Sequence, residues 1–414
     1  MDKKERRRKK GKVEAAKPAS TPKPSSFKGE EAEKETRKRE EGTRTKVFPL
    51  LIKYEENPII SPREGSWWEC RQTFNPGAIL LESKVHLLYR AIGDDGISRI
   101  GYAASEGGFG VEERLDYPVY QHPVASSEFT LYSYASGGSF GGAEDPRIVR
   151  VDGEQVLYMT YTACSEGLRV GLTSISIESF LSKRWDWTTP RLISPPGEVH
   201  KNWVIFPEKI HGKYAILHNL SPQILITYLD SLDFKPGSYL TSYHDGGNGT
   251  GRKDFWDSVI RGAGAPPIKT ELGWLLFYHA IDSREPNKYK IGAMLLDLED
   301  PRGVICCSAV PVLEPDMVYE SSGFKPGVVY LSGAVVKDGV LLVYYGASDN
   351  YVCVASCGLE EFLRTLMKGG RSAFIETQVL PNPRQKKQRV SRRRRSTSSV
   401  RKNKDEKKDE EELL

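Results

Sequence analysis

A loose repeat of apolar and polar stretches runs along the middle of the chain. In each copy an apolar stretch ends in an aromatic residue or histidine, small polar residues follow, and a second apolar stretch comes after them. The five copies are residues 86–105, 156–175, 213–231, 273–297 and 339–357. Equivalent places in the copies are Tyr89, Tyr161, His218, Tyr278 and Tyr345. Each copy predicts two antiparallel strands joined by a polar turn.

The repetition predicts an all-β fold. Sheets that recur at intervals of roughly 40–50 residues or more are typical of a β-propeller, so five copies predict a five-bladed β-propeller. Helical spacing of apolar residues is found only from Leu359 to Lys368, which predicts a C-terminal helix packed on a blade. A pair of two-layer β-sandwich domains is the alternative architecture, and the long spacing of the repeats disfavours it.

The two ends of the chain differ in composition from its body. Residues 1–46 contain 17 Lys and Arg against nine Asp and Glu, and residues 383–414 contain 13 against six. Such charged segments with few large apolar residues predict disorder. We therefore expect disordered tails at 1–46 and 381–414 and one folded domain at 47–380. The arginines at 392–395 could contact nucleic acid or an anionic surface, or could simply keep the tail soluble.

The net charge of +5 is misleading, because the tails contribute +8 and +7 and leave the body near −10. An acidic body argues against a specific nucleic-acid-binding core. No apolar run reaches the roughly 20 residues of a membrane helix, and the N-terminus lacks the apolar segment of a secretory signal. The six cysteines form no CxxC pair. These features predict a cytoplasmic protein of 414 residues with reduced thiols.

The stretch GGAEDPRI at 141–148 is the first candidate for chemistry. Pro146 fixes its own φ and favours an extended conformation at Asp145, while the glycines before it allow a sharp turn. The apolar run that follows Arg147 predicts the start of a strand. An acid held stiffly at a strand entrance is a candidate proton donor. Alternatively, Asp145 and Arg147 form an ion pair that braces a turn.

Polar residues gather near the ends of the predicted inner strands, where propeller loops converge over a central channel. They are Asn75, Arg90, Asp145, Arg147, Lys201, Asn202, His218, Asn219, Tyr278, His279, Tyr330 and Asp349. Four tryptophans lie among them: Trp67, Trp68, Trp203 and Trp256. Acids and amides beside aromatic faces suit a sugar, which offers hydroxyls around its ring and C–H groups on its faces. Core packing is the alternative role for each tryptophan.

Other chemistries lack support in the sequence. No convincing GxSxG, HExxH, P-loop or dinucleotide-binding motif is present. The glycine-rich stretch before Glu144 precedes a strand and not a helix, so it is not a phosphate-binding loop of the helix-capping kind. The seven histidines lack metal-ligand spacing, and we expect no catalytic metal.

With these residues identified, the chain resembles glycoside hydrolase family 130, the five-bladed β-propellers that include β-1,4-mannooligosaccharide and mannosylglucose phosphorylases. The resemblance runs from about Asn57 to Cys357. Its elements are NPII (57–60), FNPG (74–77), LLYRA (87–91), SRIGYA (98–103), EDPRIV (144–149), FPEK (206–209), GAGAPPIKTELGWLLFYH (262–279), LDLEDP (296–301), YESSG (319–323) and VLLVYYGASD (340–349).

The resemblance implies roles for individual residues. Asp145 of the EDPR motif would donate the proton, indirectly through a hydroxyl of the mannosyl ring. The resemblance implies no cofactor. Inorganic phosphate would be a co-substrate and would attack the anomeric carbon from the opposite face. Lys201, His218 and Arg90 match phosphate-binding positions. Asn75, Arg147, Tyr289, Tyr330 and Asp349 match positions that line the sugar site.

The chain departs from the family pattern at two cationic positions. Asn219 stands where many phosphorylases have arginine, and Ile260, next to Arg261, stands where they have lysine. Each lost cation should weaken phosphate binding, since a charge-assisted hydrogen bond contributes roughly 1.5–3 kcal/mol. The family also contains inverting β-mannosidases, which use water and need a general base about 6.5–9.5 Å from the acid. Candidate bases here are Glu208, Asp282 and Glu320, and a structural acid is the alternative role for each.

Lys201 and His218 favour a β-mannoside phosphorylase, which would release α-mannose 1-phosphate from an oligosaccharide or glycoside. An inverting β-mannosidase and a non-catalytic carbohydrate-binding propeller are the alternatives. The resemblance also makes a homo-oligomer possible. It leaves the linkage and the leaving group of the mannoside open.

Overall fold

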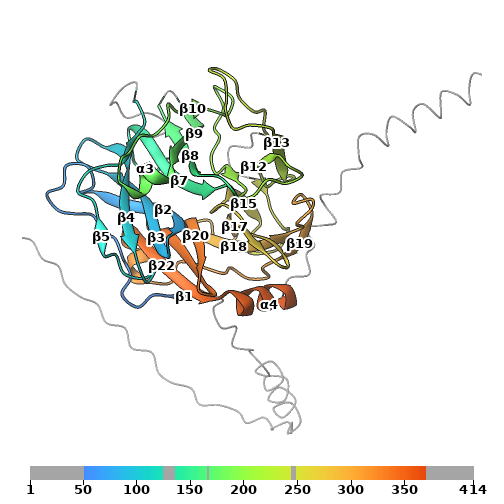
Figure 1. Cartoon of the computed structure of the whole chain (residues 1–414). Coiled ribbons are helices and arrows are strands. Elements are labelled where there is room, and N and C mark those ends of the chain that lie inside the picture. The colour runs from blue at the N-terminus through green and yellow to red at the C-terminus, as the bar shows by residue number, and fades with distance from the viewer. Residues whose placement is uncertain (1–50, 125–135, 166, 244–248, 370–414) are drawn as a thin grey trace, which may run out of the picture. The chain divides into compact units, whose positions relative to one another are not determined.

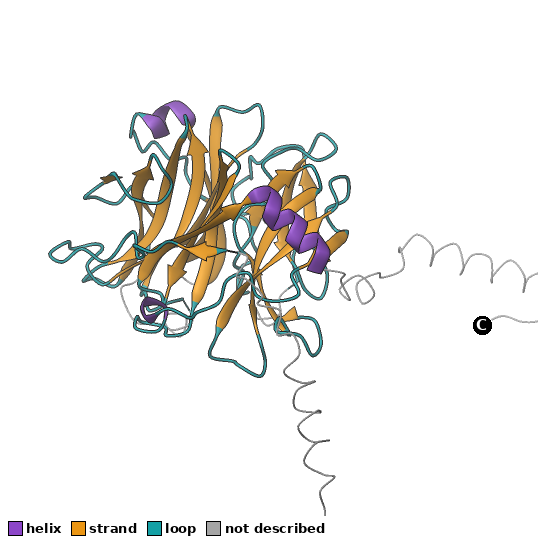
Figure 2. Cartoon of the chain, turned by 90° about the horizontal axis from the view of Figure 1, so that it is seen from below, coloured by secondary structure: helices purple, strands orange, loops and turns teal. Residues whose placement is uncertain are grey.

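The structure is a computed structural model that describes residues 51–124, 136–165, 167–243 and 249–369. The tails predicted at 1–46 and 381–414 lie outside these residues, so their disorder stays a prediction. Strands dominate the described chain (Figure 2). Its helical elements are α3 (Ile177–Leu181), η1 (Val318–Glu320) and α4 (Leu359–Gly369). In the part of the chain that is described, no helix has the length and apolar character to cross a membrane.

Five groups of strands, here called blades 1 to 5, follow one another along the described chain (Figure 1). Blade 1 contains β2 (Gln72–Leu81), β3 (Lys84–Ile92), β4 (Ile97–Ser105) and the short β5 (Glu113–Arg114) and β6 (Tyr120–Gln121). Blade 2 contains β7 (Gly141–Arg150), β8 (Val156–Cys164), β9 (Leu168–Ser176) and β10 (Arg191–Leu192).

The remaining blades are built in the same way. Blade 3 contains β11 (Val204–Ile205), β12 (Tyr214–Asn219) and β13 (Leu225–Leu229). Blade 4 contains β14 (Gly249–Thr250), β15 (Val259–Ala263), β16 (Ile268–Thr270), β17 (Gly273–Ile281), β18 (Tyr289–Leu296) and β19 (Val304–Cys307). Blade 5 contains β20 (Val329–Lys337), β21 (Val340–Ala347), β22 (Tyr351–Gly358) and the N-terminal β1 (Ile52–Lys53). The predicted five-bladed β-propeller is confirmed, and each sequence repeat forms two neighbouring antiparallel strands of one blade.

Apolar side chains fill every interface between neighbouring blades, which explains why the repeats are apolar runs and not alternating patterns. Successive strand residues point to opposite faces. Leu87 of β3 accordingly packs towards blade 5, and Leu88 packs towards blade 2. Ile216 and Leu217 divide in the same way between blades 2 and 4. The fifth cluster joins blades 4 and 5 and includes three buried residues of α4: Phe362, Leu363 and Leu366. The predicted C-terminal helix is therefore confirmed.

The repeated tyrosines serve packing and not substrate binding. Tyr89, Tyr161 and Tyr278 each pair with a glycine of the next strand, and a Cβ at that glycine would lie 2.3–2.4 Å from the tyrosine ring. The ring therefore lies directly on the neighbouring backbone, which only glycine permits. Their hydroxyls are also used: Tyr89 donates to Glu69, and Tyr278 donates to Asp257.

The inner strands bulge at equivalent places. The pairing register shifts between Phe74 and Gly77 in β2 and between Glu144 and Arg147 in β7. Shifts also occur in β15 and β20. At the bulges of β2 and β7 stand Asn75 and Asp145, with φ of 48° and 49°. The prediction that Asp145 is extended at a strand entrance is wrong: it lies within β7, and the bulge outweighs the preference that Pro146 imposes.

The ring of blades closes where the first strand meets the last blade. β1 pairs with β22, through Ile52 opposite Ser356 and Lys53 opposite Ala355. Lys53 Nζ donates to the buried Glu320 carboxylate at 2.7 Å, and Tyr345 donates to its other oxygen at 2.9 Å. Glu320 is thus a structural acid, which is one of the two roles that the sequence left open for it.

We predict that Lys53→Met weakens the closure. The substitution leaves Glu320 buried without its cation, which should lower the free energy of unfolding by about 3 kcal/mol. The matched control is Lys84→Met, which breaks the exposed Lys84–Glu106 pair and should change it by less than about 0.5 kcal/mol. Urea unfolding followed by tryptophan fluorescence gives both values. Equal effects of the two substitutions would contradict the assigned role of Lys53.

Candidate active site

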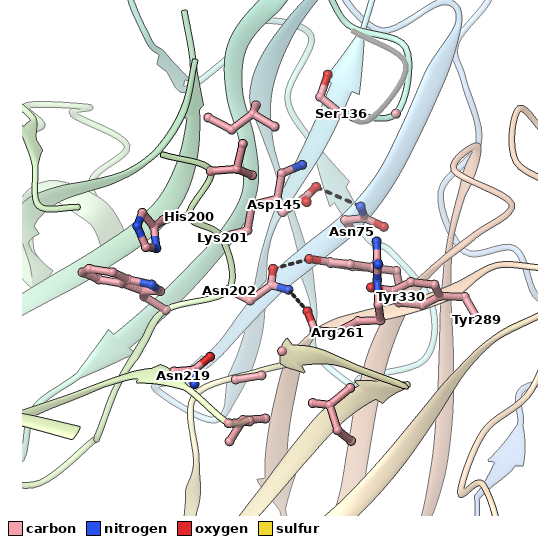
Figure 3. A pocket seen from close by; sticks show the side chains of 18 of the residues that line it. Asn75, Ser136, Asp145, His200, Lys201, Asn202, Asn219, Arg261, Tyr289 and Tyr330 are labelled. Atoms are coloured by element: carbon pink, nitrogen blue, oxygen red, sulfur yellow. Dashed lines mark hydrogen bonds between the residues drawn. The ribbon is translucent and has the colours of Figure 1, made fainter. Parts of the chain in front are cut away.

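A cavity of about 230 Å³ opens where the inner strands of the five blades meet (Figure 3). Eight of the nine residues predicted for the site line it: Asn75, Arg90, Asp145, Lys201, His218, Tyr289, Tyr330 and Asp349. They are brought together from five blades that are distant in sequence. The ninth, Arg147, is buried behind the cavity wall.

The bulges of β2 and β7 bring Asn75 and Asp145 together. Asn75 Nδ2 donates a hydrogen bond to Asp145 Oδ1 at 2.8 Å. Both residues precede a proline and both have left-handed φ angles, which asparagine and aspartate tolerate better than most residues. The FNPG and EDPR motifs are therefore the same structural device in neighbouring blades, and its product is a carboxyl group aimed into the cavity.

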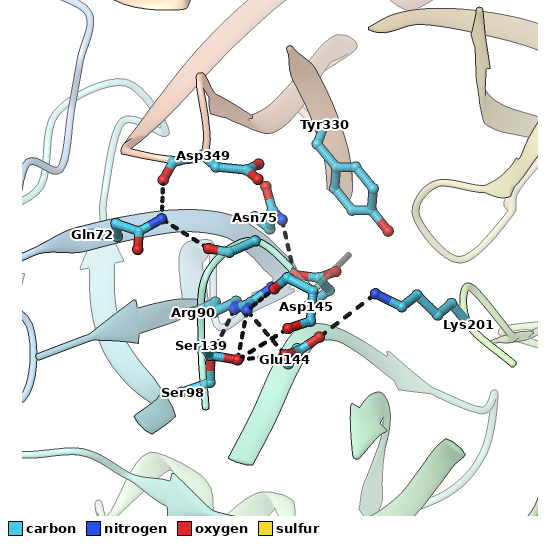
Figure 4. A network of polar contacts seen from close by, with 12 residues as sticks. Gln72, Asn75, Arg90, Ser98, Ser139, Glu144, Asp145, Lys201, Tyr330 and Asp349 are labelled. Carbon is cyan, nitrogen blue, oxygen red and sulfur yellow. Dashed lines mark hydrogen bonds and ion pairs between the residues drawn. The ribbon is translucent and has the colours of Figure 1, made fainter. Parts of the chain in front are cut away.

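Arg90 organises the acidic side of the site (Figure 4). Its Nη1 lies 3.2 Å from Asp145 Oδ1, and its Nη2 lies 3.0 Å from Glu144 Oε1. Nε donates to Ser98 Oγ, and Nη2 also donates to the carbonyl oxygen of Ser136. Arg90 lines the cavity as predicted. Because its donors are engaged by these groups, it positions Asp145 and Glu144 in this structure.

The surroundings of Asp145 lower the pKa of its carboxyl group. Burial raises the pKa of its carboxyl and is the largest single effect, but the charges of Arg90, Lys201 and Arg147 and the hydrogen bond from Asn75 together outweigh it. The pKa of Asp145 therefore lies below its ordinary value. Lys201 approaches from the blade 3 side, with Nζ 3.7 Å from Glu144 Oε2.

Asp349 is the second carboxyl group of the cavity lining. It lies in the turn after β21, where Ser348 and Asp349 both have positive φ. Lys325 Nζ lies 3.4 Å from its Oδ2. Burial raises the pKa of Asp349, and Lys325 and Arg90 only partly offset that effect. The two lining carboxyls thus have pKa values displaced in opposite directions.

Arg147 supports the wall behind Tyr330. Its Nη2 donates to Asn202 Oδ1 at 2.9 Å and to the Tyr330 hydroxyl at 3.0 Å, and its Nη1 donates to the carbonyl oxygen of Asp145. Tyr330 also stacks on His279, with ring centroids 4.0 Å apart. In the described part of the chain, the Arg147 guanidinium makes neither an ion pair nor a hydrogen bond with the Asp145 carboxylate; of Asp145 it contacts only the backbone carbonyl. The role that sequence analysis gave Arg147 in sugar binding stays a prediction.

His218 lines the cavity but does not act as a cation in this structure. Its Nδ1 lies 2.8 Å from Ser242 Oγ, and its Nε2 lies 3.0 Å from Thr227 Oγ1. Burial and the neighbouring His200 lower the pKa of His218 to about 4. Its imidazole is therefore neutral at neutral pH, and its role in phosphate binding stays a prediction.

The two departures from the family pattern both lie at the cavity. Asn219 and Ile260 line it, and so does Arg261. Arg261 lies over the Tyr289 ring, 5.8 Å from its centroid. The cationic lining residues are Arg90, Lys201, Arg261 and Lys325, against two carboxylates, Asp145 and Asp349. The lining is therefore suited to an anion despite the acidic composition of the body.

None of the three predicted general bases lines this cavity. Glu208 pairs with Lys269 at the surface, and Asp282 accepts two hydrogen bonds from Arg284. Glu320 is the buried closure acid described above. Among the described residues the cavity offers no carboxylate other than Asp145 and Asp349.

Sequence analysis missed Ser136, Tyr243 and Lys325, which also line the cavity. Only the neighbouring YESSG motif at 319–323 pointed towards Lys325. Of the four candidate tryptophans, Trp203 alone lines the cavity, while Trp68 and Trp256 are buried in clusters between blades. Trp67 is exposed outside the lining. The described residues contain no group of three or more His, Cys, Asp or Glu that could hold a metal ion.

Comparison with known proteins finds a family model, a relative and a solved structure that are all described as mannoside phosphorylases. The family model described as beta-1,4-mannooligosaccharide phosphorylase matches residues 44–368. A 1,2-beta-oligomannan phosphorylase of Thermoanaerobacter sp. (strain X514) is 37% identical over 317 residues, which cover 74% of this chain and 96% of that protein. The structure of a beta-1,2-mannobiose phosphorylase from Listeria innocua, in complex with beta-1,2-mannobiose, matches with a TM-score of 0.58 and 25% identity over 76% of this chain and 99% of that one.

We predict that the stabilising effect of Asp145 depends on pH. Its pKa is lowered on folding, so the stability gained from ionisation is present above the ordinary carboxyl value near 4 and is lost as pH falls through the lower folded value. The wild-type protein should exceed Asp145→Asn in free energy of unfolding by a constant amount above roughly pH 5 and by less below roughly pH 4. Urea titrations from pH 3 to 7 measure this difference, and a pH-independent difference would contradict the assignment.

Proposed function

Because this chain belongs to glycoside hydrolase family 130, a family of glycoside phosphorylases and related glycosidases, we propose that it is an inverting β-mannoside phosphorylase. A β-1,2-linked mannooligosaccharide is the proposed substrate, since the Thermoanaerobacter relative is a 1,2-beta-oligomannan phosphorylase. The reaction releases α-mannose 1-phosphate and a shortened saccharide.

One observation carries this proposal: a buried carboxyl group faces a cavity whose lining contains four cationic side chains, Arg90, Lys201, Arg261 and Lys325. Asp145 is held in place by Asn75 and Arg90, while Lys201 and Arg261 line the same cavity. A phosphorylase takes its nucleophile from solution, so it needs cations and not a second catalytic carboxylate. The arrangement therefore fits phosphate as the attacking group.

In the proposed reaction Asp145 supplies the proton that the leaving oxygen receives, by way of a hydroxyl of the mannosyl ring. The bond between the anomeric carbon and the glycosidic oxygen breaks. A phosphate oxygen bonds to the anomeric carbon from the opposite face, which converts the β-linkage into an α-phosphate. Lys201 holds the phosphate during the attack and spreads its charge.

Phosphate binding also accounts for how Asp145 acquires a proton. Arg90, Lys201 and Arg147 keep the pKa of Asp145 low. A phosphate dianion beside Lys201 offsets part of that positive charge, which raises the pKa of Asp145. The acid is then protonated from solvent when both substrates are ready, and it is ionised otherwise.

The hydrolytic alternative has less support. An inverting mannosidase needs a base that activates water on the face opposite Asp145. Asp349 is the remaining lining carboxyl, and burial raises its pKa while Lys325 occupies one of its oxygens. A raised pKa suits a general base, but Asp349 is paired with Lys325, and the four cationic side chains of the lining are what a phosphate nucleophile needs. We therefore favour phosphorolysis.

We predict that Asp145→Asn abolishes turnover. Loss of general acid catalysis should lower kcat by about 10³-fold, and asparagine keeps the left-handed backbone and the shape of the side chain. The matched control is Asp338→Asn, an exposed aspartate with φ of 51° in the turn between β20 and β21, which should keep wild-type kcat. Full activity of Asp145→Asn with a β-mannoside would remove Asp145 from the mechanism.

We predict further that Lys201→Ala weakens phosphate binding specifically. The loss of one charge-assisted hydrogen bond, about 1.5–3 kcal/mol, should raise the KM for phosphate at least tenfold and change the KM for the mannoside much less. Lys209→Ala, which removes an exposed lysine that pairs with Glu154, is the control. Initial rates at varied phosphate give both constants. An unchanged KM for phosphate would show that Lys201 does not hold it.

A further inference from the structure

Phe324 is an exposed aromatic side chain that is nevertheless fixed in place. It is 49% exposed and directly precedes Lys325, which lines the cavity. The tip of its ring lies on Gly138, where an added Cβ would come within 2.6 Å of the ring. Single exposed aromatics are common on protein surfaces and need no function. Phe324 differs because its ring packs directly on the backbone of Gly138, where any larger residue would clash with it.

The loop that carries Phe324 is clamped to the turn that carries Asp349. Lys325 N donates to the carbonyl oxygen of Ser348 at 2.8 Å. On the other side of Phe324, an added Cβ at Gly323 would lie 2.6 Å from the Cβ atoms of Ser348 and Asn350. Phe324 therefore moves with the Asp349 turn, and its ring keeps a fixed position relative to the lining.

Gly137, which precedes the glycine under the ring, belongs to the cavity wall. An added Cβ at Gly137 would lie 3.1 Å from Asp349 Oδ2 and 3.4 Å from Arg90 Nη1. Gln72 Nε2 donates to the Gly137 carbonyl oxygen at 3.1 Å and to that of Asp349 at 2.7 Å. The phenyl ring thus lies on Gly138, next to the lining residue Gly137, which itself lies beside Arg90 and Asp349.

An inverting displacement fixes the side from which each group approaches. The nucleophile and the leaving group must lie on opposite sides of the anomeric carbon. Lys201 lies on one side of Asp145 and Asp349 on the other (Figure 4). In Figure 3, His200 and Asn219 lie on the side away from Asn75 and Tyr289. With phosphate held at Lys201, the leaving group departs towards the Asp349 side, where Phe324 stands.

We propose that Phe324 is the platform on which the leaving sugar of the mannoside stacks, and that it sets specificity for the group released. This inference rests on the proposed phosphorylase function, because that function fixes which side the leaving group occupies. The C–H face of a pyranose lies on the phenyl ring, while its hydroxyls reach polar groups at the rim. The same surface receives the acceptor saccharide when the reaction runs in reverse.

Tyr243 is a second exposed aromatic residue at the cavity, and the proposal assigns it a different role from Phe324. It is 50% exposed and lines the same cavity, but it belongs to the chain between β13 and β14, on the blade 3 side with His200 and Asn219. In the proposed geometry Tyr243 faces the phosphate side. It should not contact the leaving sugar, although it lines the cavity and Phe324 does not.

The test is synthesis in the reverse direction, with α-mannose 1-phosphate as donor and mannose or β-1,2-mannobiose as acceptor. Phe324→Ala should raise the acceptor KM about tenfold, which corresponds to loss of roughly 1.4 kcal/mol of binding, and should leave the KM for the donor nearly unchanged. Phe324→Trp should restore the acceptor KM because it keeps a flat face. Tyr117→Ala, an exposed aromatic outside the cavity, is the control that should match wild type. Thermal unfolding of each variant verifies folding.

Three results would overturn the proposal. An unchanged acceptor KM in a folded, active Phe324→Ala variant would remove Phe324 from the leaving-group site while leaving the phosphorylase function intact. A rise in acceptor KM in Tyr243→Ala but not in Phe324→Ala would show that the two sides are assigned the wrong way round. Absence of synthesis and of phosphorolysis by the wild-type protein would remove the proposed function, and this inference with it.

Discussion

Asn75 and Asp145 meet because β2 and β7 bulge at the same place in neighbouring blades. Each bulge holds its residue at a left-handed φ before a proline, so that two short polar side chains converge at 2.8 Å. The Pro146 carbonyl oxygen of one bulge also lies against Gly77 of the other, where an added Cβ would be 2.6 Å away. The position of the candidate acid is therefore set by how two blades pack, and not by a flexible loop.

The closed ring of blades maintains that packing. Five apolar clusters, one at each blade interface of the described chain, press the inner strands together, and the β1–β22 pair with its Lys53–Glu320 contact joins the two ends. Buried charge at the centre is tolerated because Arg90 compensates Glu144 and Asp145. Because the packed blades fix the distances between Asp145 and its charged neighbours, those neighbours can set the pKa of Asp145.

The fold could be predicted from the sequence, because apolar runs and recurring tyrosines are direct signs of blade packing. Most of the lining could be predicted from the polar residues at the ends of the predicted strands and from the family resemblance. The protonation state and the role of individual polar side chains could not be predicted from the sequence. His218 and Glu320 are ordinary polar residues in sequence, and only the structure shows that one is a neutral imidazole and the other a closure acid. The conformation of Asp145 was missed because a bulge depends on pairing with a distant strand. Lys325 and Phe324 were missed because their importance comes from the Asp349 turn, to which they are bound only in three dimensions.

The central claim is that phosphate, and not water, cleaves the mannoside in this cavity. The most direct measurement is ³¹P and ¹H NMR of the wild-type protein with β-1,2-mannobiose, in the presence and absence of inorganic phosphate. The account predicts α-mannose 1-phosphate and free mannose in equal amounts, formed only when phosphate is present. Release of two molecules of mannose per disaccharide at the same rate without phosphate would contradict it.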